Sequence, residues 1–174
     1  MVIFSSLDLM FNMRIGFSKD VHKLIKNRPL ILGGVNIPYK KGLDAYSDGD
    51  VVLHSLIDAI FGALNKGDIG INFPNTDPKY HNCDSMFLLK ETKKIIDICM
   101  VNIDYIDIFI SCEEPKLETY VGFMKANISE VLDIDINRIG IQCGTNEGLG
   151  YIGKKKGIES FATILLKEKS DEQN

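Results

Sequence analysis

The chain has 174 residues, of which 45% are hydrophobic and 25% are charged, a balance typical of a soluble globular protein. A chain of this length folds as one domain and buries roughly 70% of its unfolded surface, so its core needs no disulfides. The net charge of -4, the lack of a basic patch interleaved with aromatics and the lack of an apolar run near membrane-spanning length argue against nucleic-acid and membrane binding.

The two ends of the chain are expected to lie outside a single domain of residues 13–167. Residues 1–12 lack the basic start and small-residue cleavage site of a secretory signal, which predicts a flexible N-terminal extension. Residues 168–174 are all polar and predict a frayed tail. Four widely spaced cysteines predict free thiols in a reducing compartment, namely a bacterial cytoplasm or, in a eukaryote, the plastid stroma.

The first expected elements are a strand, a hairpin and a helix. Residues 13–17 predict a short strand. Residues 29–38 predict a hairpin, because apolar triplets flank the turn Gly33-Gly34. A helix is predicted from Asp50 to Lys66, since apolar residues recur at helical spacing until Gly67.

The second half of the chain begins with an expected loop over residues 68–78, whose glycines and prolines support neither helix nor strand. Asp84 or Ser85 is expected to cap a helix that runs to about Met100. A strand, a helix and two further strands follow at residues 105–112, 117–132, 139–143 and 158–166. This order predicts an α+β fold: a ferredoxin-like sheet with helices packed on one face.

Two of the three histidines lie near carboxylates in patterns that suit a metal. If Asp20-Val21-His22 is extended, its alternation points Asp20 and His22 to the same side. A helical His54 would add a third ligand, and one carboxylate with two imidazoles is a familiar zinc set that leaves one position open. Asp50 and Asp58, four residues to either side of His54, are expected to orient its ring. Spacing alone leaves a zinc site and a helix with ordinary solvent-facing charges equally open.

Three other segments have both a functional and a structural interpretation. The glycine-rich segment 144–151 could cradle phosphate, with Glu147 on Mg²⁺ or Mn²⁺, or it is a plain surface loop with solvated lysines nearby. Residues 68–78 suit a binding loop or a connector. Residues 112–117 suit an anion contact at Lys116 or a structural turn, and His81 is expected to be an exposed loop residue.

Many ordered motifs resemble the 2-C-methyl-D-erythritol 2,4-cyclodiphosphate synthase family of the non-mevalonate isoprenoid pathway. The resemblance covers residues 13–167. It is carried by Asp20-Val21-His22, Leu32-Gly33-Gly34-Val35, Ser47-Asp48-Gly49-Asp50, His54, Gly67-Asp68-Ile69-Gly70, Phe73-Pro74, Thr76-Asp77-Pro78, Asp84-Ser85, Pro115-Lys116, Thr145, Glu147 and Leu149-Gly150.

The resemblance implies a homotrimer with active sites between neighbouring subunits. The implied reaction converts 4-diphosphocytidyl-2-C-methyl-D-erythritol 2-phosphate to the 2,4-cyclodiphosphate and CMP by intramolecular phosphoryl transfer. The implied cofactors are zinc, one per subunit, on Asp20, His22 and His54, and Mg²⁺ or Mn²⁺ on Glu147. A central channel that can take an isoprenoid diphosphate is implied as well.

The resemblance also implies substrate contacts. Thr145 matches a threonine that hydrogen-bonds the phosphates near the transition state, and Tyr46 stands where the family has a histidine that helps to stabilise that state. Positions implied to close over the methylerythritol phosphate are Asp68, Gly70, Phe73, Pro74, Asn75, Thr76 and Asp77. Positions implied for the cytidine pocket are Cys112, Pro115, Lys116, Leu117, Cys143 and Gly144, and the further substrate-binding positions are Ser47, Ile69, Asn146, Tyr151 and Lys154.

Several residues depart from the family pattern. Besides Tyr46, these are Asn75 for an acid, Gly144 and Asn146 for threonines, Lys154 for an arginine and Lys156 for an acid near the trimer axis. Two other functions therefore stay open at the level of sequence. One is a metal-dependent nucleotide phosphodiesterase that uses water, and the other is a non-catalytic trimer that binds isoprenoid diphosphates.

Overall fold

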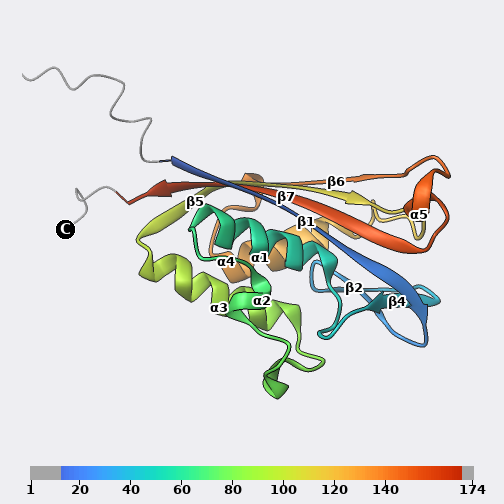
Figure 1. The fold of residues 1–174 in the computed structure, drawn as a ribbon. Helices are drawn as coiled ribbons and strands as arrows, with labels where there is room; N and C mark the ends of the chain where they lie inside the picture. Colours follow the sequence, from blue (N-terminus) through green and yellow to red (C-terminus); the bar gives the residue numbers. More distant parts are fainter. Residues whose placement is uncertain (1–12, 170–174) are drawn as a thin grey trace, which may run out of the picture.

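One mixed five-stranded sheet, in the strand order β4-β1-β7-β5-β6, forms the frame of the molecule in a computed structural model that describes residues 13–169. Its strands are β1 (Met13–Lys26), β4 (Lys41–Asp44), β5 (Val101–Ser111), β6 (Ile139–Gly144) and β7 (Gly157–Glu168). Three longer helices, α1 (Val51–Ala63), α3 (Ser85–Ile98) and α4 (Val121–Leu132), lie together under one face of this sheet (Figure 1). The expected α+β class with helices on one face is confirmed.

Alternation along the strands creates the core between the sheet and the helices. On β5, Ile106, Ile108 and Ile110 are fully buried, whereas the intervening residues are largely exposed. Helix α1 approaches β1 most closely at Gly16, where an added Cβ would lie 1.8 Å from the carbonyl oxygen of Ala59. Glycine at this position therefore lets α1 pack directly against β1, the strand that carries the Asp-x-His motif.

The topology corrects the ferredoxin-like prediction. That plan runs βαββαβ, whereas the main sheet here and its three longer helices follow the order β1, β4, α1, α3, β5, α4, β6, β7. Strand β6 pairs with β5 in parallel, with α4 as the crossover, and β7 then inserts antiparallel between β1 and β5. The sequence order of elements fixes none of these neighbours, so the prediction of a specific plan was wrong while the class was right.

Several predicted boundaries also change. The first strand continues to Lys26 because β1 pairs with β7 over most of its length and then with β4, a short strand that the prediction omitted. The hairpin is confirmed as β2 (Leu30–Leu32) and β3 (Val35–Ile37), which form a separate two-stranded sheet. The predicted loop of residues 68–78 contains a helical turn, α2 (Ile69–Asn72), and a 3₁₀ turn, η2 (Pro78–Tyr80), follows it.

The remaining elements include short turns and the chain ends. A 3₁₀ turn, η3 (Ile136–Arg138), precedes β6, and a helical turn, α5 (Gly150–Gly153), precedes β7. The predicted extension of residues 1–12 lies outside the described residues, as do residues 170–174, whereas Glu168 still belongs to β7. None of the helices between residues 13 and 169 has both the length and the apolar character that a membrane crossing requires.

Candidate active site

Strand β1 and helix α1 bring together the three side chains that the sequence selected as metal ligands. Asp20 and His22 share the face of β1 that packs on α1, and His54 lies one turn into α1. Asp20 Oδ2 is 2.9 Å from His22 Nε2 and 3.1 Å from His54 Nδ1, and the two ring nitrogens are 3.0 Å apart. Among residues 13–169 these three form the one cluster whose donor atoms lie close enough for a shared metal ion.

The donor set fits zinc. A carboxylate oxygen and two imidazole nitrogens are common zinc ligands, and a tetrahedron with bonds of about 2.0–2.1 Å has edges of roughly 3.3 Å, near the separations observed. Burial acts to raise the pKa of Asp20, but the hydrogen bonds to His22 and His54 outweigh it and hold that pKa below its ordinary value. Asp20 therefore stays ionised, as a ligand must, and the three atoms can hold a cation between them.

The far side of the His54 ring contacts two hydroxyl groups. Its Nε2 atom is 2.9 Å from Ser47 Oγ and 3.0 Å from Ser85 Oγ. Ser85 in turn donates from its hydroxyl to Asp48 Oδ1 over 2.5 Å and from its backbone N–H to Asp48 Oδ2 over 2.9 Å. Sequence reasoning missed Ser85 and Asp48, because nothing in their spacing reveals that the start of α3 meets the turn before α1.

The expectation that Asp50 and Asp58 orient the His54 ring was wrong. The Asp50 carboxylate instead accepts four backbone N–H groups, from Gly33, Gly34, Val52 and Leu53. It thereby caps α1 and holds the β2–β3 turn against it, and burial, with a contribution from nearby Asp48, raises its pKa to about 6. Asp58 accepts the N–H of Ile69 over 2.6 Å, and neither carboxylate has a hydrogen bond to the His54 ring among the described residues. Asp50 bonds His54 only through its backbone carbonyl, which accepts the His54 N–H over 3.0 Å.

A cavity of about 320 Å³ opens beside the candidate metal cluster of Asp20, His22 and His54. Its walls include His22 and His54, and six positions that the sequence assigned to substrate or catalysis also line it: Tyr46, Ser47, Ile69, Gly70, Phe73 and Asn75. Arg28 holds this wall in place by donating to the carbonyl groups of Ala45 and Ser47. Tyr80 and Leu88, which the sequence did not suggest, complete the apolar part of the lining.

The rest of the predicted substrate loop has local structural contacts. Asp68 accepts the N–H of Ile71 and caps α2, while Asp77 accepts the N–H of Lys79 and caps η2. Pro74 and Thr76 do not belong to the walls of this cavity. His81 is exposed, as expected, but its ring packs edge-on against Tyr46 with 5.1 Å between centroids.

A second, smaller cavity of about 90 Å³ lies where β5 and β6 end. It is lined by Cys112, Pro115, Lys116, Leu117, Glu118, Cys143, Gly144 and Thr145, which brings together all six positions assigned to a cytidine pocket. Burial raises the pKa of Cys112 to about 12 and that of Cys143 to about 11, so both remain thiols at neutral pH. Their place in this wall is as apolar lining and not as nucleophiles.

The glycine-rich segment leads out of this cavity. Thr145 Oγ1 donates to Glu147 Oε1 over 2.7 Å. Glu147 is exposed, and its backbone has a positive φ of 49°. The backbone N–H of Asn146 donates to Glu113. Tyr151, a predicted substrate contact, donates its hydroxyl hydrogen bond to Glu159, which also forms an ion pair with Lys19. Lys154, another predicted contact, is exposed just after α5.

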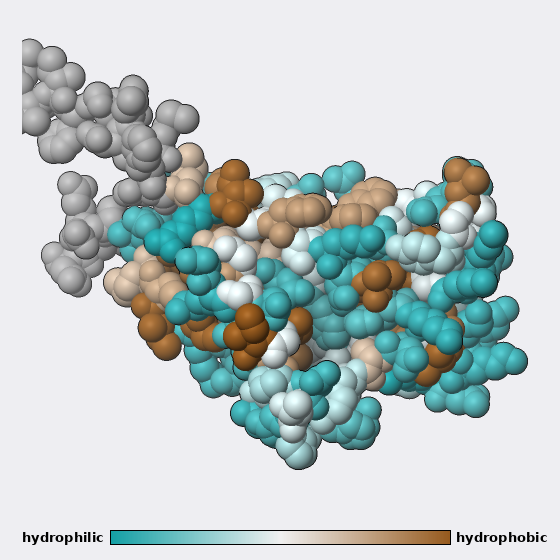
Figure 2. Space-filling view, viewed as in Figure 1, coloured by the Kyte–Doolittle hydropathy of each residue, from teal (hydrophilic) through white to brown (hydrophobic). Residues whose placement is uncertain are grey.

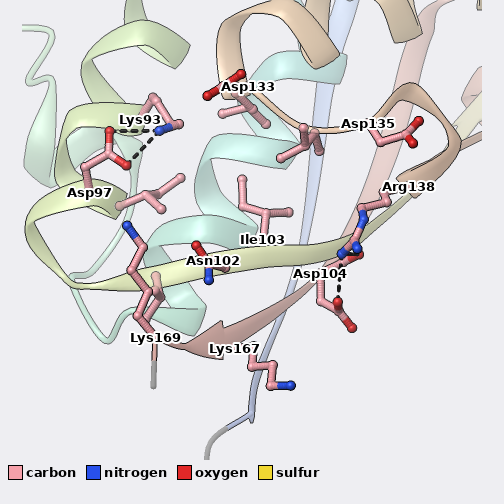
Figure 3. Close-up of a pocket in the computed structure, with 14 residues that line it drawn as sticks. Lys93, Asp97, Asn102, Ile103, Asp104, Asp133, Asp135, Arg138, Lys167 and Lys169 are labelled. Atoms are coloured by element: carbon pink, nitrogen blue, oxygen red, sulfur yellow. Dashed lines mark hydrogen bonds and ion pairs between the residues drawn. The ribbon is translucent and has the colours of Figure 1, made fainter. Parts of the chain in front are cut away.

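A larger cavity of about 490 Å³ lies at the other end of the sheet, where β5 begins and β7 ends (Figure 3). Lys167 in its wall pairs with Met13, roughly 30 Å along β1 from His22. Two of its cations are already neutralised, because Lys93 bonds Asp97 and Arg138 bonds Asp104 (Figure 3). His22 and His54 thus line the cavity of about 320 Å³, whereas the cavity of about 490 Å³ lies far from them.

The chain closely resembles known proteins along nearly its full described length. A family model described as the YgbB family matches residues 13–167. A relative from Francisella philomiragia, named 2-C-methyl-D-erythritol 2,4-cyclodiphosphate synthase, is 49% identical over 154 residues, which are 88% of this chain and 97% of the relative. A relative of the same name from Clostridium perfringens is 46% identical, over 88% of this chain and 99% of its own length.

Solved structures show the same likeness. The bifunctional IspDF from Campylobacter jejuni matches with a TM-score of 0.87 and 42% identity over 91% of this chain, which spans 43% of that longer protein. The IspF structure from Plasmodium falciparum, described as a CDP complex, matches with a TM-score of 0.81 and 37% identity over 91% of this chain and 98% of that one.

Proposed function

The chain belongs to the YgbB family and has the activity of that family's 2-C-methyl-D-erythritol 2,4-cyclodiphosphate synthases, and we propose that the cluster of Asp20, His22 and His54 is the centre of this activity. The reaction converts 4-diphosphocytidyl-2-C-methyl-D-erythritol 2-phosphate to the 2,4-cyclodiphosphate and CMP, a lyase step in isoprenoid biosynthesis. The observation that supports this centre is that three ligand-type side chains converge beside a cavity of about 320 Å³.

The reaction requires positioning more than covalent chemistry from the protein. An oxygen of the 2-phosphate forms a bond to the β-phosphorus, and the bond from that phosphorus to the α–β bridging oxygen breaks, so that CMP leaves with the electron pair. Both reacting groups belong to one molecule, so the enzyme must fold the substrate until they meet. A rigid wall of α1 and β1 on one side and the segment around Phe73 on the other can impose that shape.

Zinc is the metal that the cluster would hold. Bound there, it would supply Lewis-acid polarisation of a β-phosphate oxygen and lower the barrier to attack. His22 Nε2, His54 Nδ1 and Asp20 Oδ2 already converge, so binding needs little rearrangement of the chain. The cytidine pocket would be the cavity of about 90 Å³, and the CDP found with the Plasmodium falciparum relative supports a nucleotide of this class.

Glu147 and Thr145 are proposed to serve the diphosphate. Glu147 would hold Mg²⁺ or Mn²⁺ there, since its exposed carboxylate is a hard oxygen ligand. The Thr145 hydroxyl, which now donates to Glu147, can turn to donate to a phosphate oxygen and steady it. Tyr46, which lines the same cavity as His22, would donate its phenolic hydrogen bond to the reacting groups.

We propose that the active site is completed between subunits of a homotrimer. Strands β7 and β5 separate β1, which carries Asp20 and His22, from β6, which carries Cys143 and leads into Thr145. The distance between β1 and β6 across the sheet is about 14 Å. The sheet face away from the helices carries exposed Ile15 and Phe17, each more than 60% accessible, together with Tyr105 and Phe109. Figure 2 shows hydrophobic side chains along the upper edge of the molecule, where Figure 1 places the sheet. A bare apolar sheet face of this kind is typical of a subunit interface.

Replacing Phe17 by aspartate is expected to dissociate the trimer. The side chain is 66% exposed in one chain, so the substitution leaves the fold intact but places a charge on the proposed interface. Light scattering after size-exclusion chromatography should report monomers, with turnover abolished. Phe123→Asp, on an equally exposed residue of α4, is the matched control and should stay trimeric. A Phe17→Asp protein that remains a trimer would refute this interface.

Replacing Lys116 by alanine is expected to raise the KM about tenfold and leave kcat nearly unchanged. The exposed ammonium group borders the cavity of about 90 Å³. A charge-assisted hydrogen bond that stabilises bound substrate and transition state equally affects binding alone when it is removed. Calorimetric titration with CDP should show the same weakening, and Lys125→Ala on α4 should show none. An unchanged CDP affinity would place the nucleotide elsewhere.

Product analysis tests the activity itself. Phosphorus NMR of the purified chain with substrate, Mg²⁺ and zinc should show the cyclic diphosphate and CMP in equal amounts. A linear phosphate that takes up labelled oxygen from water would indicate the phosphodiesterase. Tight binding of isoprenoid diphosphates without any CMP would indicate the non-catalytic trimer. Location in a bacterial cytoplasm and the isoprenoid diphosphate in the channel stay predictions.

A further inference from the structure

Both nitrogens of the His54 ring have polar partners, on the side that faces Asp20 and His22 and on the side that faces away from them. Nδ1 points to Asp20 and His22, while Nε2 points to the hydroxyls of Ser47 and Ser85. His54 and both serines are buried, and Ser85 is fully inaccessible. The ligand set alone does not account for this second layer, which the Ser47-Asp48-Gly49-Asp50 turn and the start of α3 build together.

The direction of each hydrogen bond in this layer can be worked out from chemistry. An ionised carboxylate only accepts hydrogen bonds, and Asp48 Oδ1 lies 2.5 Å from Ser85 Oγ, so the single hydroxyl proton of Ser85 points to Asp48. The backbone N–H of Ser85 donates to the other oxygen of Asp48 and holds the pair in register. Ser85 Oγ then has only lone pairs left for His54, and Nε2 must be the donor across their 3.0 Å contact.

Ser47 cannot set this direction alone. Its hydroxyl oxygen accepts the N–H of Gly49 over 3.2 Å, but its own proton has no fixed acceptor in this contact and can turn toward or away from His54. Asp50, which lies nearby in sequence, has its carboxylate occupied by four backbone donors. On the Nε2 side of the ring, Asp48, acting through Ser85, is therefore the group that requires a proton, while the Asp20 carboxylate, 3.1 Å from Nδ1, competes for a proton on the other nitrogen when no metal is bound.

We propose that Asp48 and Ser85 are positioning residues that keep Nε2 of His54 protonated, so that Nδ1 is the nitrogen left to bind a metal beside Asp20 and His22. A histidine in the other tautomer would present an N–H to the ion and could not bind it until the ring exchanged its proton. The pair also locks the ring plane, because Ser85 is anchored at the first turn of α3 and Asp48 in the turn before α1. This inference rests on the proposed metal centre and extends it to residues outside the ligand set.

The tautomer can be read without any metal. Long-range proton–nitrogen NMR of the metal-free chain, at about pH 9 where an ordinary imidazole is neutral, should show a protonated Nε2 on His54. In Ser85→Ala and Asp48→Asn this preference should disappear or reverse. Zinc affinity, measured by competition with a chelator, should fall about 10- to 100-fold in both variants.

The control and the opposing results are specific. Ser55→Ala also removes a fully buried hydroxyl of α1, but that hydroxyl bonds Val52 and Ser160, so the His54 signals and zinc affinity should not change. An unprotonated Nε2 in the wild-type chain would overturn the inference, and so would wild-type Nε2 protonation and zinc affinity in folded Asp48→Asn. A wild-type chain with the expected tautomer that bound no zinc would refute the metal centre, and the two failures are thus distinguishable.

Discussion

Replacing His22 by alanine is expected to lower kcat/KM by at least about a thousandfold, which corresponds to about 4 kcal/mol of transition-state stabilisation. The reason is that His22 Nε2 supplies one of three atoms that converge within about 3 Å of one another, and two ligands hold zinc far less firmly than three. His22 is only partly buried at the end of the metal cluster, so the fold should survive its replacement. CMP release, followed by chromatography, measures the effect.

The same variant should no longer hold zinc. Metal analysis of the purified wild-type chain should give one zinc per subunit, and His22→Ala should give almost none. Lys90→Ala, on the exposed side of α3, is a control that should keep both metal and turnover. A metal-free His22→Ala protein that turned over at the wild-type rate would contradict the assignment of this cluster to the reaction.

Replacing Asp50 by alanine is expected to lower the free energy of unfolding by roughly 4 kcal/mol, because an N-cap is worth about 1 kcal/mol and each stranded buried donor costs about 1–3 kcal/mol. The substitution strands four backbone N–H groups, two at the start of α1 and two in the β2–β3 turn. Gly33 and Gly34 have positive φ values of 57° and 71°, so this turn depends on an outside partner to fix it. Urea denaturation followed by circular dichroism measures the change.

A conservative variant separates the two halves of that effect. Asp50→Ser can still accept from the first turn of α1 but cannot reach both glycines, so its stability should lie between those of the wild type and Asp50→Ala. An Asp50→Ala protein as stable as the wild type would show that the helix and the hairpin are held by other contacts. Because the Asp50 carboxylate bonds backbone N–H groups and not the His54 ring, zinc affinity in the folded fraction should be nearly unaffected.

The ligand set could be predicted from sequence because each part depends on local periodicity. Asp20 and His22 share a face in any extended strand, and an apolar pattern with a stop at Gly67 placed His54 on a helix. The hairpin around Gly33-Gly34 and the cap at Asp84 were predictable for the same reason, since turn and cap chemistry lies in adjacent residues. These predictions needed no knowledge of which elements meet.

What could not be predicted depends on contacts between distant segments. The parallel pairing of β5 with β6 is a choice among neighbours that no local pattern encodes. Helical spacing put Asp50 and Asp58 on one face with His54. In the structure, however, the Asp50 carboxylate accepts the N–H groups of Gly33 and Gly34, and the Asp58 carboxylate accepts that of Ile69. Ser85 meets His54 only because α3 begins beside the turn at Asp48, which a linear pattern does not reveal.

Anomalous X-ray scattering from crystals of the wild-type chain, recorded on both sides of the zinc edge, tests the metal centre most directly. A single strong peak within bonding distance, about 2.0–2.2 Å, of Asp20 Oδ2, His22 Nε2 and His54 Nδ1 is expected. Crystals soaked in excess zinc that show no peak between these three atoms would contradict a metal-assisted reaction at this site.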